Sequence, residues 1–277
     1  MLKKIVPLCC LFFSTYCIAQ LGGQSTYQFL NLVASPRQAA LGGKVLTNVD
    51  WDVTQGVYNP ATINVDMDNQ FALNYTSYLA GISYGTAAYA YTIDRRNQTI
   101  HAGVTYINYG DFEGYDENGV ATSNFSRGEA ALSFGYALQI GYSDFYAGAN
   151  LKLINSSLEQ YNSFGVATDL AVLYSNERLD FQGTLVVRNL GTQITTYAGR
   201  RESLPLEVDL GLSQTLENVP LRWHVTFENL QQWPIGNPNP ARVTTDLEGN
   251  QTEEKVGLLA NVVRHTILGA ELFRTRL

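Results

Sequence analysis

Apolar and polar residues alternate with a period of two over long stretches of this chain. The clearest stretch runs from Glu129 to Ile140, where every second residue from Ala130 onward is apolar or aromatic. The positions between them carry small or polar residues: Glu129, Ala131, Ser133, Gly135, Ala137 and Gln139. A period of two is that of a β-strand. The run is also longer than the roughly five or six residues of an average strand in a soluble protein.

The same alternation recurs along most of the chain and predicts an all-β protein. Residues 206–214, for example, place leucines and a valine on one face, with Glu207 and Asp209 on the other. We expect about ten strands, because ten stretches match the period-two template. They lie near residues 70–79, 82–93, 99–109, 128–140, 145–155, 162–175, 181–190, 206–217, 221–230 and 265–273.

Charged residues within these strands keep to the polar side of the alternation. The main ones are Lys152, Asp169, Arg188, Asp209 and Glu228. Two arrangements fit this pattern. A soluble β-protein would bury the apolar face, whereas a membrane β-barrel would turn that face to lipid and the polar face to its interior. In a barrel we expect these charges to pair across the interior, because an unpaired buried charge is costly.

The lengths of the connections favour the barrel. We expect short turns at residues 94–98, 141–144, 176–180 and 217–220, and longer loops at residues 110–127, 155–162, 191–205 and 231–255. Outer-membrane barrels have short turns at one rim and long loops at the other. Aromatic residues near strand ends also fit the girdles at membrane interfaces. We therefore predict a transmembrane, antiparallel outer-membrane β-barrel.

The first 19 residues have the features of a secretory signal peptide. Lys3 and Lys4 precede an apolar run from Ile5 to Ala19, which is too short for a transmembrane helix. All three cysteines lie in this run, so we expect no disulfide or cysteine metal site in the exported chain. Without the two lysines the net charge of −7 becomes −9. We do not expect such an acidic chain to bind nucleic acid.

No local motif points to catalysis. Residues 81–85 have the spacing G-x-S-x-G, but a nucleophile elbow needs a helix after the serine, and the residues after Ser83 alternate like a strand. The histidines, His101, His224 and His265, lie in three different predicted strands without a metal-ligand spacing. We therefore expect a non-enzymatic protein without a metal or cofactor.

One segment before the first expected strand lacks any alternation. Residues 38–61 read QAALGGKVLTNVDWDVTQGVYNPA. The residues of interest in it are Gly42, Gly43, Asp50, Asp52, Asn59, Pro60 and Ala61. The glycine pair permits a turn or a close backbone approach. The aspartates suit caps on neighbouring backbone, and the Asn-Pro pair suits a turn leading into the first strand. We expect this segment to fold against the lumen of the barrel.

The same residues carry a resemblance to a known family. The run from Ala39 to Gly43, the two aspartates and the Asn-Pro-Ala end resemble the N-terminal segment of FadL-like outer-membrane barrels. They are more similar still to the PorV/PorQ proteins of the Bacteroidetes type IX secretion system. Residues 22–37 and 264–272 look specifically like the PorQ branch of that family.

The resemblance implies a fourteen-stranded barrel whose N-terminal segment folds inward from the periplasmic side. The ten strands counted above either close on themselves or belong to a chain that lacks C-terminal strands. We accordingly expect a signal peptide at residues 1–19, a periplasmic or plug segment at residues 20–69 and a transmembrane barrel at residues 70–277.

The resemblance also implies a function at the cell outer membrane. The family assists the export or surface attachment of cargo proteins, so the implied partners are other secretion components, secreted cargo and outer-membrane lipid. The alternative is a FadL-like transporter of hydrophobic small molecules. The expected inward faces are mostly small and polar, which argues mildly against an apolar lumen.

Overall fold

The computed structural model describes most of the chain after the predicted signal peptide. The described residues are 25–33, 35–94, 98–116, 118–158, 161–176, 178–233, 235, 244–245, 251–252 and 257–272. The chain divides into two compact units. The larger comprises Gly23–Leu230 and His265–Leu277, and the smaller comprises Met1–Gly22 and Gln231–Arg264. The predicted signal peptide at residues 1–19 lies outside the described residues.

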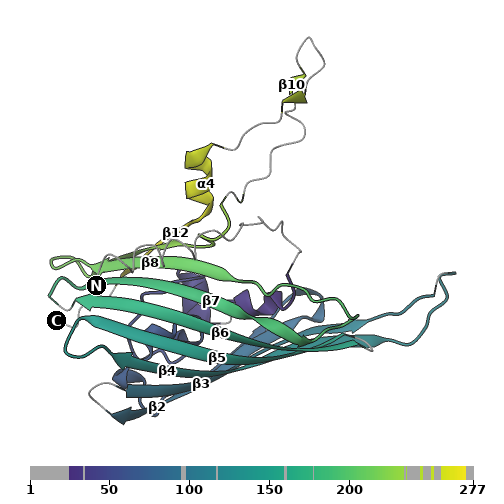
Figure 1. Cartoon of the computed structure of the whole chain (residues 1–277), viewed down its shortest axis with the longest axis horizontal. Helices are drawn as coiled ribbons and strands as arrows, with labels where there is room; N and C mark the ends of the chain where they lie inside the picture. Colours follow the sequence, from purple (N-terminus) through teal and green to yellow (C-terminus); the bar gives the residue numbers. More distant parts are fainter. Residues whose placement is uncertain are drawn as a thin grey trace, which may run out of the picture. The chain divides into compact units, whose positions relative to one another are not determined.

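The larger unit is built on one antiparallel sheet of ten strands (Figure 1). Its strands are β1 (Phe71–Ser77), β2 (Ser83–Asp94), β3 (Gln98–Phe112), β4 (Phe125–Gln139), β5 (Phe145–Leu158), β6 (Tyr161–Asn176), β7 (Phe181–Thr195), β8 (Glu207–Thr215), β9 (Leu221–Phe227) and β12 (Thr266–Leu272). They are joined in sequence order from β1 to β9, and β12 then pairs with β9. The predicted all-β class and the ten predicted strands are confirmed.

One of the four predicted longer loops is wrong. We expected a loop at residues 155–162, but β5 continues to Leu158 and pairs there with Tyr161, the first residue of β6. Only residues 159–160 separate the two strands. The polar composition was misleading because Ser156, for example, is fully buried on a polar face of the sheet.

The sheet buries its polar face and exposes its apolar face. On the inner face, defined here as the face packed against residues 25–69, Lys152 and Arg188 are at most 2% exposed. On the opposite, outer face, Leu132, Leu170 and Leu185 are 46–49% exposed. Buried charge and a wide exposed apolar surface are the two departures from ordinary burial that carry information. The exposed apolar side chains span the sheet and include Tyr89, Tyr91, Ile100, Val104, Phe134, Leu151, Val172, Leu268 and Leu272.

Residues 25–69, called here the N-terminal segment, pack against the inner face (Figure 1). The segment contains five short helical turns: η2 (Gln28–Asn31), α2 (Pro36–Ala40), α3 (Gln55–Tyr58), η3 (Pro60–Thr62) and η4 (Val65–Met67). A further turn, η5 (Leu79–Gly81), connects β1 to β2. η3 contacts β4, β5 and β6, and α3 contacts β3 and β4. These turns are too short to give a helical period, so the sequence pattern does not reveal them.

The N-terminal segment runs from one end of the sheet to the other. We call the end with the β2–β3, β4–β5, β6–β7 and β8–β9 connections the short-turn rim, and the other end the long-loop rim. Ser25 pairs with Ser203 at the long-loop rim. At the short-turn rim, the N–H of Asn69 donates to the carbonyl of Ala90 at 3.0 Å. The two ends of the segment therefore lie at opposite rims of the sheet.

Apolar contacts between the segment and the inner face form two clusters. Near the long-loop rim, Tyr27 and Phe29 pack with residues such as Ile154. Toward the short-turn rim, Leu46 and Ile63 belong to a second cluster that includes small residues of the sheet. The hydrophobic core therefore lies between the segment and the sheet, although the outer face of the sheet is the more apolar one.

The smaller unit falls mostly outside the described residues. Its described elements are β10 (Thr244–Thr245), which pairs with β11 (Gln251–Thr252), and the helix α4 (Leu258–Arg264). The loop predicted at residues 231–255 is therefore described only in part. Among the described residues, no helix is long and apolar enough to span a membrane.

Candidate functional site

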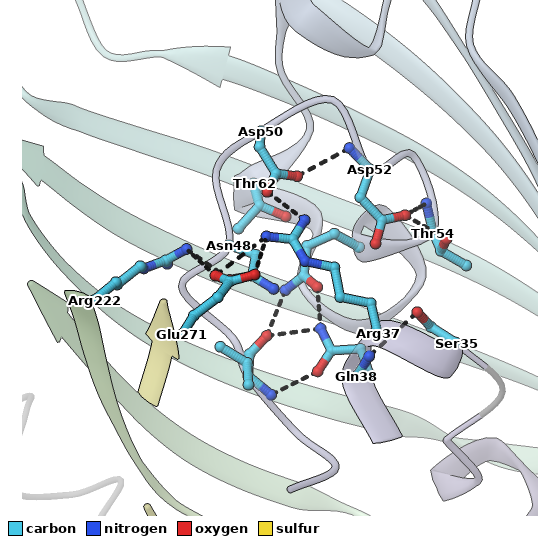
Figure 2. Close-up of polar contacts among 12 residues, drawn as sticks. Ser35, Arg37, Gln38, Asn48, Asp50, Asp52, Thr54, Thr62, Arg222 and Glu271 are labelled. Carbon is cyan, nitrogen blue, oxygen red and sulfur yellow. Dashed lines mark hydrogen bonds and ion pairs between the residues drawn. The ribbon is translucent and has the colours of Figure 1, made fainter. Parts of the chain in front are cut away.

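The segment singled out in the sequence, residues 38–61, is a hydrogen-bonded coil on the inner face (Figure 2). Gln38 is 1% exposed, and its side chain both donates to the carbonyl of Val45 at 2.9 Å and accepts from the N–H of Val45 at 2.7 Å. The side chain of Gln55 donates to the same carbonyl at 2.7 Å and also bonds to Gln38. The side-chain amides of Gln38 and Gln55 therefore stabilise the local fold of the segment.

The glycine pair makes the turn that was predicted for it. Gly42 and Gly43 have φ of 95° and 115°, which side chains other than glycine rarely adopt. The N–H of Gly43 donates to the carbonyl of Gln38 at 2.8 Å and closes α2. A Cβ at Gly42 would lie 3.1 Å from Ile267, so this turn also passes close to the edge strand β12.

The two aspartates bond to neighbouring backbone, as predicted. The Asp50 carboxylate accepts the N–H of Asp52 at 2.9 Å, and the Asp52 carboxylate accepts the N–H of Thr54 at 3.0 Å. These contacts fold the chain tightly ahead of α3. A structural role therefore accounts for both carboxylates.

The Asn-Pro-Ala motif lies in close contact with the sheet. Asn59 accepts the N–H of Ala61 and donates to Thr184 on β7, each at 3.0 Å. A Cβ added at Gly148 on β5 would lie only 2.2 Å from the carbonyl carbon of Pro60. The motif does form a turn, but the prediction that it leads into the first strand is wrong, because η4 comes between it and β1. It instead fixes the segment to β5 and β7.

Arg37 joins the segment to the edge strand β12. Its guanidinium lies 2.5 Å from Asp50 and 3.0 Å from Glu271 of β12 (Figure 2). Arg222 of β9 extends the cluster, 4.0 Å from Glu271 and with a 2.8 Å hydrogen bond to Asn48. Burial would lower the pKa of Arg37, but the charges of Asp50 and Glu271 outweigh it and raise the pKa.

We expect Arg37→Ala to lower the free energy of unfolding by about 1–2 kcal/mol, since it removes hydrogen bonds to two carboxylates that are themselves partly exposed. Urea unfolding of the refolded protein in detergent measures this effect. Arg178, exposed at the β6–β7 turn, provides the control, and Arg178→Ala should leave stability within about 0.5 kcal/mol. Equal losses for the two variants would contradict a role of Arg37 in holding the segment.

A second ionic cluster centres on Glu207, the first residue of β8. Its carboxylate lies 2.7 Å from Lys44 of the segment and 3.1 Å from Arg188 of β7, and it accepts a 2.7 Å hydrogen bond from Asn31. Lys44 is also 3.3 Å from Glu228. The cluster thus binds two separate parts of the segment to the sheet.

A third polar cluster joins β5, β6 and β7. Lys152 is 2.7 Å from Asp169 and donates a 2.9 Å hydrogen bond to the side chain of Asn189. Asp169 also accepts the N–H of Asn189 at 2.8 Å. All three residues are at most 2% exposed. The ions therefore have several polar partners, which a buried pair needs if it is not to be strongly destabilising.

The predicted pairing of inward-facing charges is correct for some residues only. Lys152 and Asp169 pair with each other, whereas Arg188 pairs with Glu207 and Glu228 pairs with Lys44. Asp209 is fully buried and accepts the N–H of Asn229 at 2.9 Å. Lys44, Glu207, Arg222 and Glu271 were not named among the charges expected to pair, although Glu207 was placed on the polar face. Glu207, Arg222 and Glu271 lie in predicted strands on the polar side of the alternation, which could have marked them as partners.

The described residues include no group of three or more histidine, cysteine, aspartate or glutamate side chains suited to hold a metal ion. The histidines lie apart. His101 bonds to the carbonyl of Val53 at 3.0 Å, and His265 bonds to that of Glu228 at 2.6 Å. Ser83 opens the strand β2, as predicted, so no helix follows it to form a nucleophile elbow. The ionic clusters around Arg37 and Glu207 join the N-terminal segment to the sheet and so form an interface within the protein.

No protein-family model matches the chain, and no curated protein matches it. A functional proposal therefore rests on the geometry of the interface between the N-terminal segment and the sheet.

Proposed function

We propose that the chain forms an outer-membrane β-barrel with the N-terminal segment as its plug. The single observation that carries this is the sheet with its buried charges and exposed aliphatic and aromatic side chains. Water does not favour such a surface, whereas a bilayer does, and outer-membrane strands alternate in this sense. The strands β3 to β7 have 14 to 16 residues each. They exceed the roughly 9–11 residues needed to cross a bilayer.

Both edges of the sheet bear on how the barrel is completed. Among the described strands, β1 and β12 each have one neighbour. A free edge in hydrocarbon leaves backbone groups unsatisfied. Both edge strands already contact the segment, β1 through Asn74 to Thr54 at 3.4 Å and β12 through Glu271 to Arg37. We propose that the sheet surrounds the segment and that the barrel closes either through β12 and β1 themselves or through further strands, of which the family resemblance implies four.

Within the outer membrane, we propose a non-enzymatic role in type IX protein secretion, in which the barrel assists the export or surface attachment of cargo proteins. Two observations support a role through protein contacts. First, the N-terminal segment covers the inner face of the sheet and is held there by ion pairs and hydrogen bonds. Second, the residues of that inner face are mostly polar. The partners expected are other outer-membrane secretion components and secreted cargo. The FadL-like alternative, transport of a hydrophobic small molecule, calls for an apolar lumen.

Deletion of the gene tests this function. We expect the protein in the outer-membrane fraction of the parent strain, and we expect its deletion to lower the amount of cargo that is secreted or attached to the cell surface. Re-expression of the full chain should restore both. If cargo secretion and attachment stay intact while uptake of a hydrophobic solute is lost, the secretion function is wrong and the transporter is right.

A further inference from the structure

A cavity opens at the short-turn rim between the N-terminal segment and the sheet. It has a volume of about 220 Å³. Residues of the segment line one wall, and residues near the ends of β2 to β6 line the other. This volume is below the roughly 300–1,000 Å³ of pockets that enclose whole small-molecule ligands. It suits a single side chain or a fragment of similar size.

The residues that line the cavity include both apolar and acidic side chains. Ile63, Ala137 and Leu173, all buried in the cluster on the inner face, contribute apolar surface. The charged residues among those that line it are Asp66 and Asp94, and both are acidic. An aliphatic stem with a positive charge at its end matches such a site, and this is the structure of a lysine or arginine side chain. Arginine in particular is enriched at the centres of protein interfaces.

The segment wall of the cavity is held in place by hydrogen bonds. The side chain of Asn64 donates to the carbonyl of Asp50 at 3.0 Å and to that of Thr62 at 2.9 Å, and it accepts the N–H of Asp66 at 2.7 Å. These bonds hold the turn that carries Val65 and Asp66, both of which line the cavity.

We propose that this cavity is the docking site for a lysine or arginine side chain of a protein partner that approaches the short-turn rim. Val65, which lines the cavity and is 41% exposed, supplies apolar contact around that side chain. The acidic balance of the whole chain, with a net charge of −7, favours the approach of a basic surface. The proposal deepens the proposed function by assigning partner contacts to one rim.

The first test measures binding of butylguanidinium to the purified full chain in detergent by ligand-observed NMR. We expect saturable binding, with no binding of butyrate or butanol. Asp66→Asn should weaken it about fivefold, the order expected for one partly exposed charge pair. Glu217→Gln removes an exposed carboxylate in the β8–β9 turn of the same rim, away from the cavity, and should leave binding unchanged. Absence of binding, or equal weakening by both variants, would overturn the proposal.

Arg95 and Arg96 follow Asp94 directly and lie outside the described residues, so they require their own variant. If butylguanidinium binds only after Arg95→Gln and Arg96→Gln are introduced together, the chain's own arginine fills the cavity and the proposal is wrong. Binding to the unaltered chain supports it.

The second test uses cells and identifies the occupant. A photo-crosslinking residue at Val65 should capture a protein at a position next to a lysine or arginine. The same residue at Val219, 47% exposed in the β8–β9 turn, is the matched control and should not capture that protein. Capture of no protein at Val65, or equal capture at both positions, would overturn the proposal. Outer-membrane fractionation and cargo secretion are measured separately, so failure of the docking site is distinguishable from failure of the proposed function.

Discussion

Gly148→Ala is expected to prevent the N-terminal segment from packing against the sheet. An added Cβ would lie 2.2 Å from the carbonyl carbon of Pro60, 2.3 Å from its oxygen and 2.4 Å from the nitrogen of Ala61. All three atoms belong to backbone, and β5 is fixed between β4 and β6, so neither side can give way cheaply. Insertion of extra volume into a packed core typically costs about 1–3 kcal/mol, and this contact lies at or above the top of that range.

Two measurements follow the fate of this variant. The free energy of unfolding in detergent should fall by about 3 kcal/mol, and limited trypsin digestion should cut after Arg37 and Lys44, which are held by ion pairs in the parent protein. Gly183→Ala on β7 is the control, because the nearest atom to its added Cβ is at an ordinary 3.4 Å. Wild-type stability and trypsin resistance of Gly148→Ala would contradict the close contact.

The effect of Gly148 shows what the sequence leaves open. Alternation is a local signal, and because every second residue of each strand faces the same side, all ten strands could be predicted. A glycine within such a strand is ambiguous, since it fits a bulge, a bend or a close approach equally well. Only the position of Pro60 against β5 decides between these.

Polarity misled the prediction at one hairpin for a related reason. Residues 155–162 are rich in serine and asparagine and read as a loop by the composition of soluble proteins. In this sheet the inner face is polar, so Ser156 and Ser163 are buried strand residues. Composition therefore marks loops less well in a chain that buries its polar face.

The sequence could predict that inward-facing charges form ion pairs, but it could not predict which residue pairs with which. Arg37 and Glu271 are separated by 234 positions in the sequence, and no local pattern relates them. The parity of Glu271 in its strand indicates that it faces inward, which restricts its partners to inward-facing residues and the segment. Only the path of the N-terminal segment across the inner face brings Arg37, rather than another of these residues, next to Glu271.

The buried pair between Lys152 and Asp169 gives the second large expected effect. Lys152→Met keeps an unbranched side chain of similar length but leaves the Asp169 carboxylate buried without its cation. Breaking a buried pair by removal of one partner typically costs about 3–5 kcal/mol. Asp169 keeps the N–H of Asn189 as a donor, so the free energy of unfolding should fall by about 3 kcal/mol.

The double variant Lys152→Met with Asp169→Asn separates loss of the pair from loss of packing. The asparagine oxygen can still accept the N–H of Asn189, and no charge is left uncompensated, so most of the lost stability should return. A double-mutant cycle measured by urea unfolding then gives a coupling of at least 1 kcal/mol, within the roughly 0.5–3 kcal/mol seen for residues in contact. Arg178→Met, at an exposed turn, should change stability by less than about 0.5 kcal/mol. If the losses of the two single variants simply add, the pair does not act as a unit, and the polar interior is held by its backbone hydrogen bonds instead.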